Sequence, residues 1–167
     1  MSERSPAPGA LALVQSLVNT LDLEGGADSL DTAEGRARFE LTAQEVPRAR
    51  ELRESLRAAL LAHAGHPPHR EVTPLGELLA AAPLVVAVDD TDGSATLAPA
   101  GARPLLTRVA EAVAEALVAG TWMRLKACEA ADCHWAYYDR SPAGRGRWCS
   151  MQLCGARAKM RRYRAKG

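Results

Sequence analysis

The fold of this chain is decided by residues 128–154, CEAADCHWAYYDRSPAGRGRWCSMQLC, which hold all four of its cysteines. The cysteines form two pairs, Cys128 with Cys133 and Cys149 with Cys154, and four residues separate the partners in each pair. Paired spacing of this kind is typical of a structural zinc site, in which four thiolates surround one tetrahedral ion. We therefore predict one Zn²⁺ bound by these four residues. Two disulfides or four unrelated buried thiols are the alternatives.

The insert between the two pairs has the composition of a β-hairpin. His134–Asp139 is strand-like, Ser141–Gly144 is turn-like, and Arg145–Trp148 leads back. Ser150 can then cap a helix that continues to about Ala165. A knuckle, a hairpin and a helix in this order predict a small treble-clef-like module. Because its core is too small to be stable alone, the metal should hold the module folded.

The predicted metal shell also bears on catalysis. Four thiolates leave no coordination position for water or a substrate, so a catalytic zinc is not expected. His134, next to Cys133, is an alternative ligand; it could equally be a strand residue or a DNA contact. The chain shows no glycine-rich phosphate loop, nucleophile elbow or paired catalytic carboxylates. We therefore expect a protein that is not an enzyme.

Residues 1–122 are expected to form an acidic, mainly helical domain. Only one of the seven aromatic residues, Phe39, precedes residue 122, so the core must be built from Leu, Val and Ala, which favours packed helices. A β-branched run at 84–88 and the segment 95–98 predict one short β-hairpin. The predicted fold class is α+β, mainly helical, with a basic zinc module over residues 123–167. Apolar spacing places the helices at about 11–21, 31–41, 42–64, 74–82 and 105–126.

The two parts of the chain carry opposite charge. The whole chain has a net charge of +1, which taken alone argues against a nucleic-acid partner. Residues 1–123, however, hold 10 Lys and Arg against 17 Asp and Glu, a net of −7, while residues 124–167 hold 11 against 3, a net of +8. Four thiolates and one Zn²⁺ would lower the second value by two. The module therefore stays strongly basic.

Most of this positive charge lies on the predicted final helix. Such a helix suits phosphate contacts and could enter the major groove of double-stranded DNA. Ala156, Met160 and Tyr163 would form the apolar seam that packs on the hairpin. A solvated helix face, or docking of the module on the acidic domain, are the alternatives. The residues predicted to contact DNA are Arg145, Arg147, Arg157, Lys159, Arg161, Arg162, Arg164 and Lys166.

A second function class is a zinc-stabilised module that binds protein or RNA. Trp135, Tyr137 and Tyr138, if exposed, could stack on unpaired bases. Buried rings would remove that option.

Other polar residues of the first domain form two clusters. Asn19 and Asp22, three residues apart at the end of the first helix, form a candidate ligand site; helix capping and a solvated loop are the alternative. His63, His66 and His69 could bind a transition metal or belong to an exposed loop. We also expect a small-molecule effector or a protein partner at this domain, and a homodimer.

The beginning of the chain, MSERSPAPG, lacks the apolar core of a signal peptide, and no stretch approaches the 18 or so apolar residues of a membrane span. These features predict a cytoplasmic protein that does not engage the membrane.

The motifs described above resemble a known family. Trp148–Met151 and Cys154–Lys159 resemble the CGNR zinc finger, and the pattern over Cys128–Asp139 fits its first half. Upstream, Val18–Glu24 resembles the start of the ABATE domain, which precedes this finger in bacterial proteins, and Gly120–Cys128 resembles the junction. The resemblance implies a stress-linked transcriptional regulator that binds DNA through the finger. One position departs from the family pattern, because the Asn of CGNR is Ala156 here.

Overall fold

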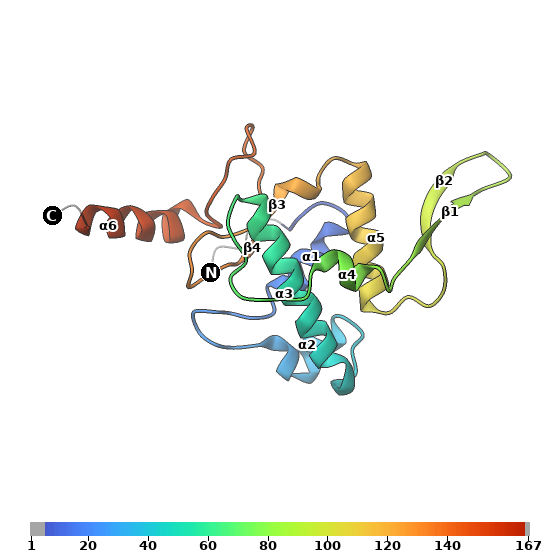
Figure 1. The fold of residues 1–167 in the computed structure, drawn as a ribbon, viewed down its shortest axis with the longest axis horizontal. Helices are drawn as coiled ribbons and strands as arrows, with labels where there is room; N and C mark the ends of the chain where they lie inside the picture. The colour runs from blue at the N-terminus through green and yellow to red at the C-terminus, as the bar shows by residue number, and fades with distance from the viewer. Residues whose placement is uncertain (1–5, 166–167) are drawn as a thin grey trace.

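The computed structural model describes residues 6–165, and its core is a packed set of helices. The helices α1 (Leu11–Val18), α3 (Val46–His63) and α5 (Leu105–Val118) contact one another (Figure 1). Their apolar faces supply most of the fully buried side chains, among them Leu17 and Leu56. The expected Leu, Val and Ala core is therefore confirmed. The shorter segments are η1 (Ser29–Asp31), α2 (Ala33–Ala37), η2 (Ala43–Glu45), α4 (Leu75–Leu79) and η3 (Trp122–Arg124).

The long central helix begins with a capping box. The backbone N–H of Thr42 donates to the Glu45 carboxylate at 2.8 Å, and the Thr42 hydroxyl caps the same turn. The first turn is the 3-10 turn η2, so α3 itself begins at Val46. This reciprocal capping satisfies backbone donors that would otherwise have no partner.

The fifth helix ends earlier than its apolar spacing predicted. Instead of continuing to residue 126, α5 ends at Val118, because Gly120 adopts a left-handed conformation with φ of 67°. The N–H of Thr121 then bonds the carbonyl of Ala116, at 2.8 Å. Likewise α1 ends at Val18, three residues short of the prediction.

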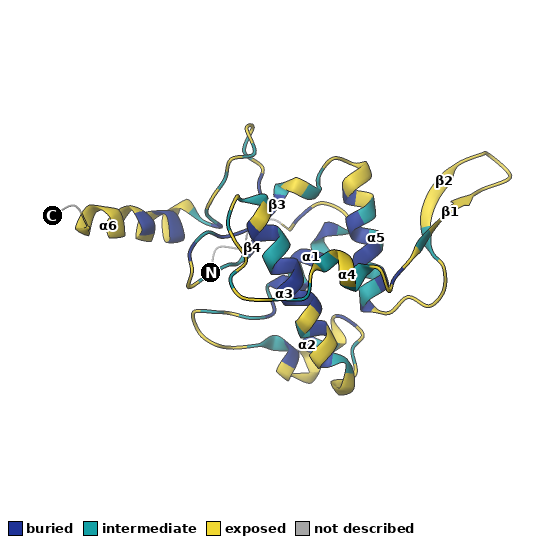
Figure 2. Cartoon of the chain, viewed as in Figure 1, coloured by how far each residue is buried: buried dark blue, intermediate teal, exposed yellow. Residues whose placement is uncertain are grey.

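The predicted first hairpin is present. The strands β1 (Leu84–Val88) and β2 (Ala95–Pro99) pair antiparallel, with Val86 opposite Leu97. The hairpin extends from one end of the molecule (Figure 1), and most of its residues are exposed (Figure 2).

The second sheet corrects the hairpin predicted inside the cysteine insert. Strand β4 (Ala136–Tyr138) pairs with β3 (Leu125–Ala127), which precedes the first cysteine, and not with residues 145–148. The pairing differs because β3 packs on α3 and β4 packs on α1, so the sheet joins the main core. Leu125 and Ala136 are fully buried in the same apolar cluster as these helices.

The last helix lies apart from the body at the end opposite the first hairpin (Figure 1). It starts as a π-helical segment, η4 (Met151–Gly155), and continues as α6 (Ala156–Arg164). The predicted apolar seam is wrong, because Ala156 is exposed and the Met160 and Tyr163 side chains are 52% and 78% exposed. Within α6 itself only Ala158 is buried, since α6 runs beyond the surface that could cover it. Among the described residues, no helix is long and apolar enough to span a bilayer.

Candidate metal centre and nucleic-acid interface

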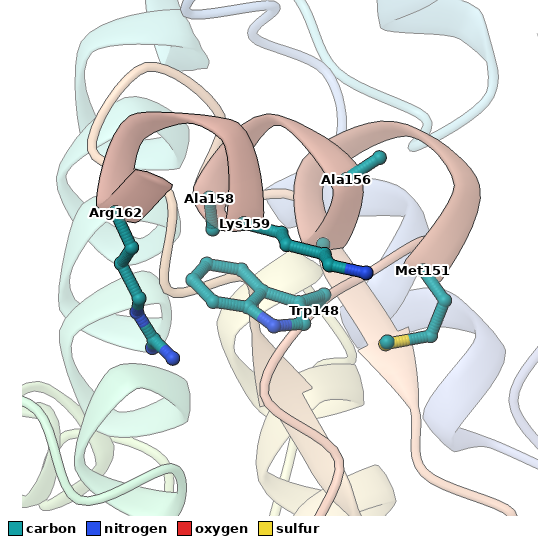
Figure 3. Close-up of a pocket in the computed structure, with 7 residues that line it drawn as sticks. Trp148, Met151, Ala156, Ala158, Lys159 and Arg162 are labelled. Atoms are coloured by element: carbon teal, nitrogen blue, oxygen red, sulfur yellow. The ribbon is translucent and has the colours of Figure 1, made fainter. Parts of the chain in front are cut away.

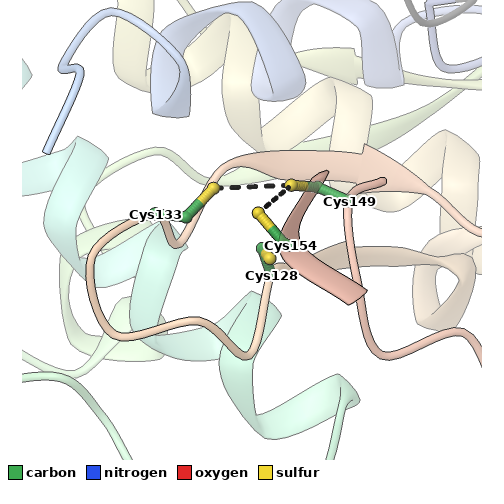
Figure 4. A group of neighbouring side chains, drawn as sticks. All are labelled: Cys128, Cys133, Cys149 and Cys154. Carbon is green, nitrogen blue, oxygen red and sulfur yellow. Dashed lines mark hydrogen bonds between the residues drawn. The ribbon is translucent and has the colours of Figure 1, made fainter. Parts of the chain in front are cut away.

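The four cysteines meet at one point between the β3–β4 sheet and η4 (Figure 4). All four Sγ atoms lie within 4.8 Å of one another; Cys133 Sγ and Cys149 Sγ are 3.4 Å apart, and Cys149 Sγ and Cys154 Sγ 3.5 Å. No pair is a disulfide. Thiolates about 2.3 Å from a tetrahedral zinc lie about 3.8 Å from one another. The donor set and its spacing therefore fit Zn²⁺.

Local backbone turns bring the ligands together. Cys128 follows β3, and its N–H bonds the carbonyl of Trp135 at 3.0 Å. Cys133 closes the knuckle by donating its N–H to Ala130 at 2.9 Å. The second pair is positioned by Ser150, whose hydroxyl accepts from the N–H of Leu153 at 3.3 Å and so starts the turn that carries the last ligand.

Proton release should accompany metal binding at this centre. Burial raises the pKa of the Cys154 thiol, and the hydrogen bond with Cys149 raises it further. Zinc binds the thiolate form of cysteine, so the ion must displace the thiol protons as it binds.

His134, the alternative ligand, lies outside the sulfur cluster that the described residues form. Its Nδ1 is 2.9 Å from the carbonyl oxygen of Cys128, and its backbone has a φ of 43°. The imidazole therefore joins the two ends of the turn that runs from Cys128 to His134.

A buried ion pair holds the loop between the two cysteine pairs, and sequence reasoning missed it. The Lys126 ammonium lies 3.0 Å from the Asp139 carboxylate, and both side chains are buried. Asp139 also accepts from the N–H groups of Ser141 and Gly146, at 3.0 and 2.7 Å. Although burial opposes ionisation, the bonds from Ser141 and Lys126 lower the pKa of Asp139 to about 2. This carboxylate replaces the strand pairing predicted for the loop.

A fully buried arginine ties the zinc knuckle to the helical domain. Arg57 on α3 donates to the carbonyl of His134 at 3.0 Å and to that of Val18 at 2.9 Å. Its Nε lies 3.1 Å from the Glu54 carboxylate. Burial opposes ionisation of Glu54, but the hydrogen bond from His69 and the charge of Arg57 lower its pKa to about 2. The charges are thus paired where burial would otherwise be costly.

The candidate ligand pair near the first helix takes separate structural roles. The Asn19 amide donates to the carbonyl of Ala136 at 2.9 Å and accepts from its N–H at 2.7 Å. Asn19 thereby satisfies both backbone groups of the first residue of β4. Asp22 accepts from the N–H of Glu24 at 3.1 Å and caps a loop.

The three histidines do not converge on one point. His63 Nδ1 lies 2.7 Å from the carbonyl of Leu125, His69 lies against Glu54, and His66 lies 3.6 Å from the Glu129 carboxylate. Among the described residues these histidines form no metal-binding group, so the option of a histidine metal site has no support. His63 and His66 instead contact residues of the zinc module.

The basic residues predicted to contact DNA fall into two groups. Arg147 pairs with Glu129, and Arg157 on α6 pairs with Glu24 of the acidic domain at 2.9 Å. Lys166 lies outside the described residues. Of the residues predicted to contact DNA, five are exposed and have no ion-pair partner in the described part of the chain: Arg145, Lys159, Arg161, Arg162 and Arg164.

A pocket of about 410 Å³ lies against α6 (Figure 3). The Trp148 indole lies beneath the helix, and Lys159 and Arg162 extend past it on either side. By contrast, Tyr137 is buried, and its hydroxyl donates to the carbonyl of Gly146 at 2.7 Å. Burial therefore removes Tyr137 as a stacking residue, whereas Trp135 and Tyr138 are partly exposed. Trp148 is the ring that lines a pocket together with Lys159 and Arg162.

Packed helices followed by a four-thiolate centre define a zinc-finger protein with a helical N-terminal domain. Residues 10–120 match the model of the ABATE family, described as "Putative stress-induced transcription regulator", and residues 124–167 match the CGNR zinc finger. Since the first match covers more than half of the chain, this protein belongs to the ABATE family. No curated protein matches the chain. The cysteine cluster and the CGNR match together establish one structural zinc.

Proposed function

We propose that this protein is a cytoplasmic transcriptional regulator that binds double-stranded DNA through α6, and that it is not an enzyme. The observation that carries the proposal is that α6 extends from the body and bears four exposed cations without an ion-pair partner among the described residues, Lys159, Arg161, Arg162 and Arg164. A helix with side chains is about 10–12 Å across, close to the width of the major groove. The zinc centre holds the start of this helix, at Cys154. We do not count Arg147 and Arg157 among the DNA contacts, because each forms an ion pair within the protein.

Binding to DNA should depend steeply on salt. If these four cations and Arg145 each neutralise a phosphate, log K should fall against log salt with a slope of about −4.5. The double variant Arg161→Ala, Arg164→Ala should reduce that slope by about 2 and weaken binding roughly fiftyfold in about 100 mM salt. Fluorescence anisotropy with a duplex of random sequence measures both quantities.

The matched control is Arg103→Ala, which removes a cation that pairs with Glu111 in the helical domain. It should leave the slope unchanged. A flat salt dependence in the unaltered protein would contradict the proposal.

The Trp148 pocket favours a second candidate function, binding of unpaired bases in single-stranded DNA or RNA. An indole face is a stacking platform for any base, and Lys159 and Arg162 are placed to contact the flanking phosphates. If so, Trp148→Leu should weaken binding to a single-stranded oligonucleotide by about tenfold and binding to a duplex by less than about twofold. Anisotropy measures both affinities.

Tyr163→Leu is the control, because Tyr163 is an exposed aromatic residue on α6 and does not line the pocket. Equal loss of duplex and single-strand binding in Trp148→Leu would argue against stacking.

A second pocket, of about 490 Å³, supports an effector site in the helical domain. It lies among α3, α4 and α5, with a floor that includes Leu52, Leu78 and Leu105. We propose this pocket for a small molecule with an apolar body.

A further inference from the structure

The hairpin of β1 and β2 exposes an apolar surface, and within the described chain it contacts the helical domain through β2, which packs on α5. β1 reads LVVAV and contains no charge, and Val86 and Val88 are 68% and 58% exposed. The two strands form a sheet of their own (Figure 1). An isolated two-stranded hairpin is marginally stable in water, and contiguous exposed apolar residues mark interaction sites.

The hydrogen bonds show which backbone groups face outward. The N–H of Asp89 bonds the carbonyl of Ser94, and the N–H of Ala100 bonds the carbonyl of Pro83. In an antiparallel pair, residues alternate between bonding the neighbouring strand and facing away from it. Because residues 83 and 89 face β2, so do 85 and 87. The N–H and C=O groups of Leu84, Val86 and Val88 therefore lie on the free edge of β1.

The two edges of the hairpin differ in their capacity to pair. By the same alternation, the outward residues of β2 are Ala95, Leu97 and Pro99. Proline has no N–H, so this edge is interrupted. The β1 edge has neither a proline nor a charged residue, which are the features that prevent edge strands from pairing.

We propose that the β1 edge pairs with the β1 edge of a second copy of this chain, antiparallel about a twofold axis at Val86. Val86 would lie opposite Val86 of the second copy, and Leu84 opposite its Val88. The edge is self-complementary in this register and supplies about six inter-strand hydrogen bonds. Two hairpins then become one four-stranded sheet.

The charge of the hairpin selects the antiparallel arrangement. Asp89, Asp90 and Asp92 lie at the tip, next to the end of β1. Antiparallel pairing places the two acidic tips at opposite ends of the sheet, whereas parallel pairing would place them side by side, where like charges repel. The inference uses the hairpin alone and does not rest on DNA binding.

Sedimentation of the full, zinc-loaded chain tests the proposal. We expect a reversible monomer–dimer equilibrium at micromolar to submillimolar concentration, as is usual for a small interface. Val86→Pro removes the central N–H donor from each copy and should raise the dissociation constant at least about tenfold. A proline whose N–H would face solvent is tolerated on an edge strand, so the hairpin should still form.

Leu97→Pro is the matched control, because Leu97 is the cross-strand partner of Val86 and faces the other edge. It should change the dissociation constant by less than about twofold. Amide hydrogen exchange gives an independent measurement: the N–H groups of Val86 and Val88 should become protected as protein concentration rises. A chain that stays monomeric, an equal effect of the two prolines, or unprotected Val86 and Val88 amides in the dimer would overturn the proposal.

Discussion

Replacing Cys149 by serine should remove the zinc and lower the stability of the whole chain, not only that of residues 124–167. Cys149 Sγ lies 3.4 and 3.5 Å from two of the other three sulfur atoms, so its loss opens the tetrahedral shell. Few apolar side chains are available to replace the metal, because the buried cluster here consists of three of the cysteines with Ala130 and Tyr137. A module of this size depends on its metal for folding.

The effect should reach the helices because one core spans both parts of the chain. β3 packs on α3, and the knuckle and β4 are bonded to Arg57 and Asn19. We expect the zinc content to fall from about one ion per chain to near zero and the melting temperature to fall by roughly 10 °C or more. Mass spectrometry measures the metal. Far-UV circular dichroism follows the helices, and tryptophan fluorescence follows residues 122–148.

Met151→Ser is the control, since Met151 lies between Cys149 and Cys154 in the sequence but is 72% exposed. It should keep the zinc and nearly all of the stability. If Cys149→Ser instead melts in two steps, with the helical signal unchanged, the two parts of the chain fold independently and the expected coupling is wrong.

The second large effect is expected for Arg57→Leu. Arg57 is fully buried, and its removal leaves the carbonyls of Val18 and His134 without their donor and Glu54 without one of its cations. Breaking a buried, hydrogen-bonded charge pair costs about 3–5 kcal/mol, and the melting temperature should fall by roughly 10 °C. Arg57→Lys should recover little of the stability, because an ammonium group cannot reproduce the three hydrogen bonds that the planar guanidinium donates. Urea unfolding gives the free energies.

Arg103→Leu provides the comparison, because Arg103 also pairs with a glutamate but is mostly exposed. Exposed pairs contribute about 0–1 kcal/mol. If both substitutions lower the free energy of unfolding by the same amount, the buried contacts of Arg57 do not stabilise the junction between the two parts of the chain.

The local parts of this structure could be predicted from the sequence. The spacing of Cys128, Cys133, Cys149 and Cys154 was enough to predict the zinc site, because each pair closes within one short turn. The capping box at Thr42 and the β1–β2 hairpin are likewise set by neighbours in sequence, and the structure confirms both. The split of charge into −7 and +8 needed only a count of residues.

Other features depended on residues far apart in the chain. The pattern of the insert favoured a strand pair inside it, but β4 pairs with β3, whose burial on α3 no local spacing could indicate. Ala156, Met160 and Tyr163 have helical spacing, yet the helix runs beyond any surface that could cover them.

The sequence by itself therefore determined the metal, its four ligands and the basic character of the last helix. The tertiary structure decided what the remaining polar residues do. Asn19 and Arg57 reach partners 117 and 77 residues away, and Arg157 pairs with Glu24 across 133 residues. Whether a polar side chain binds a ligand or its own backbone depends on which group burial places beside it, and that is fixed only when the distant segments pack.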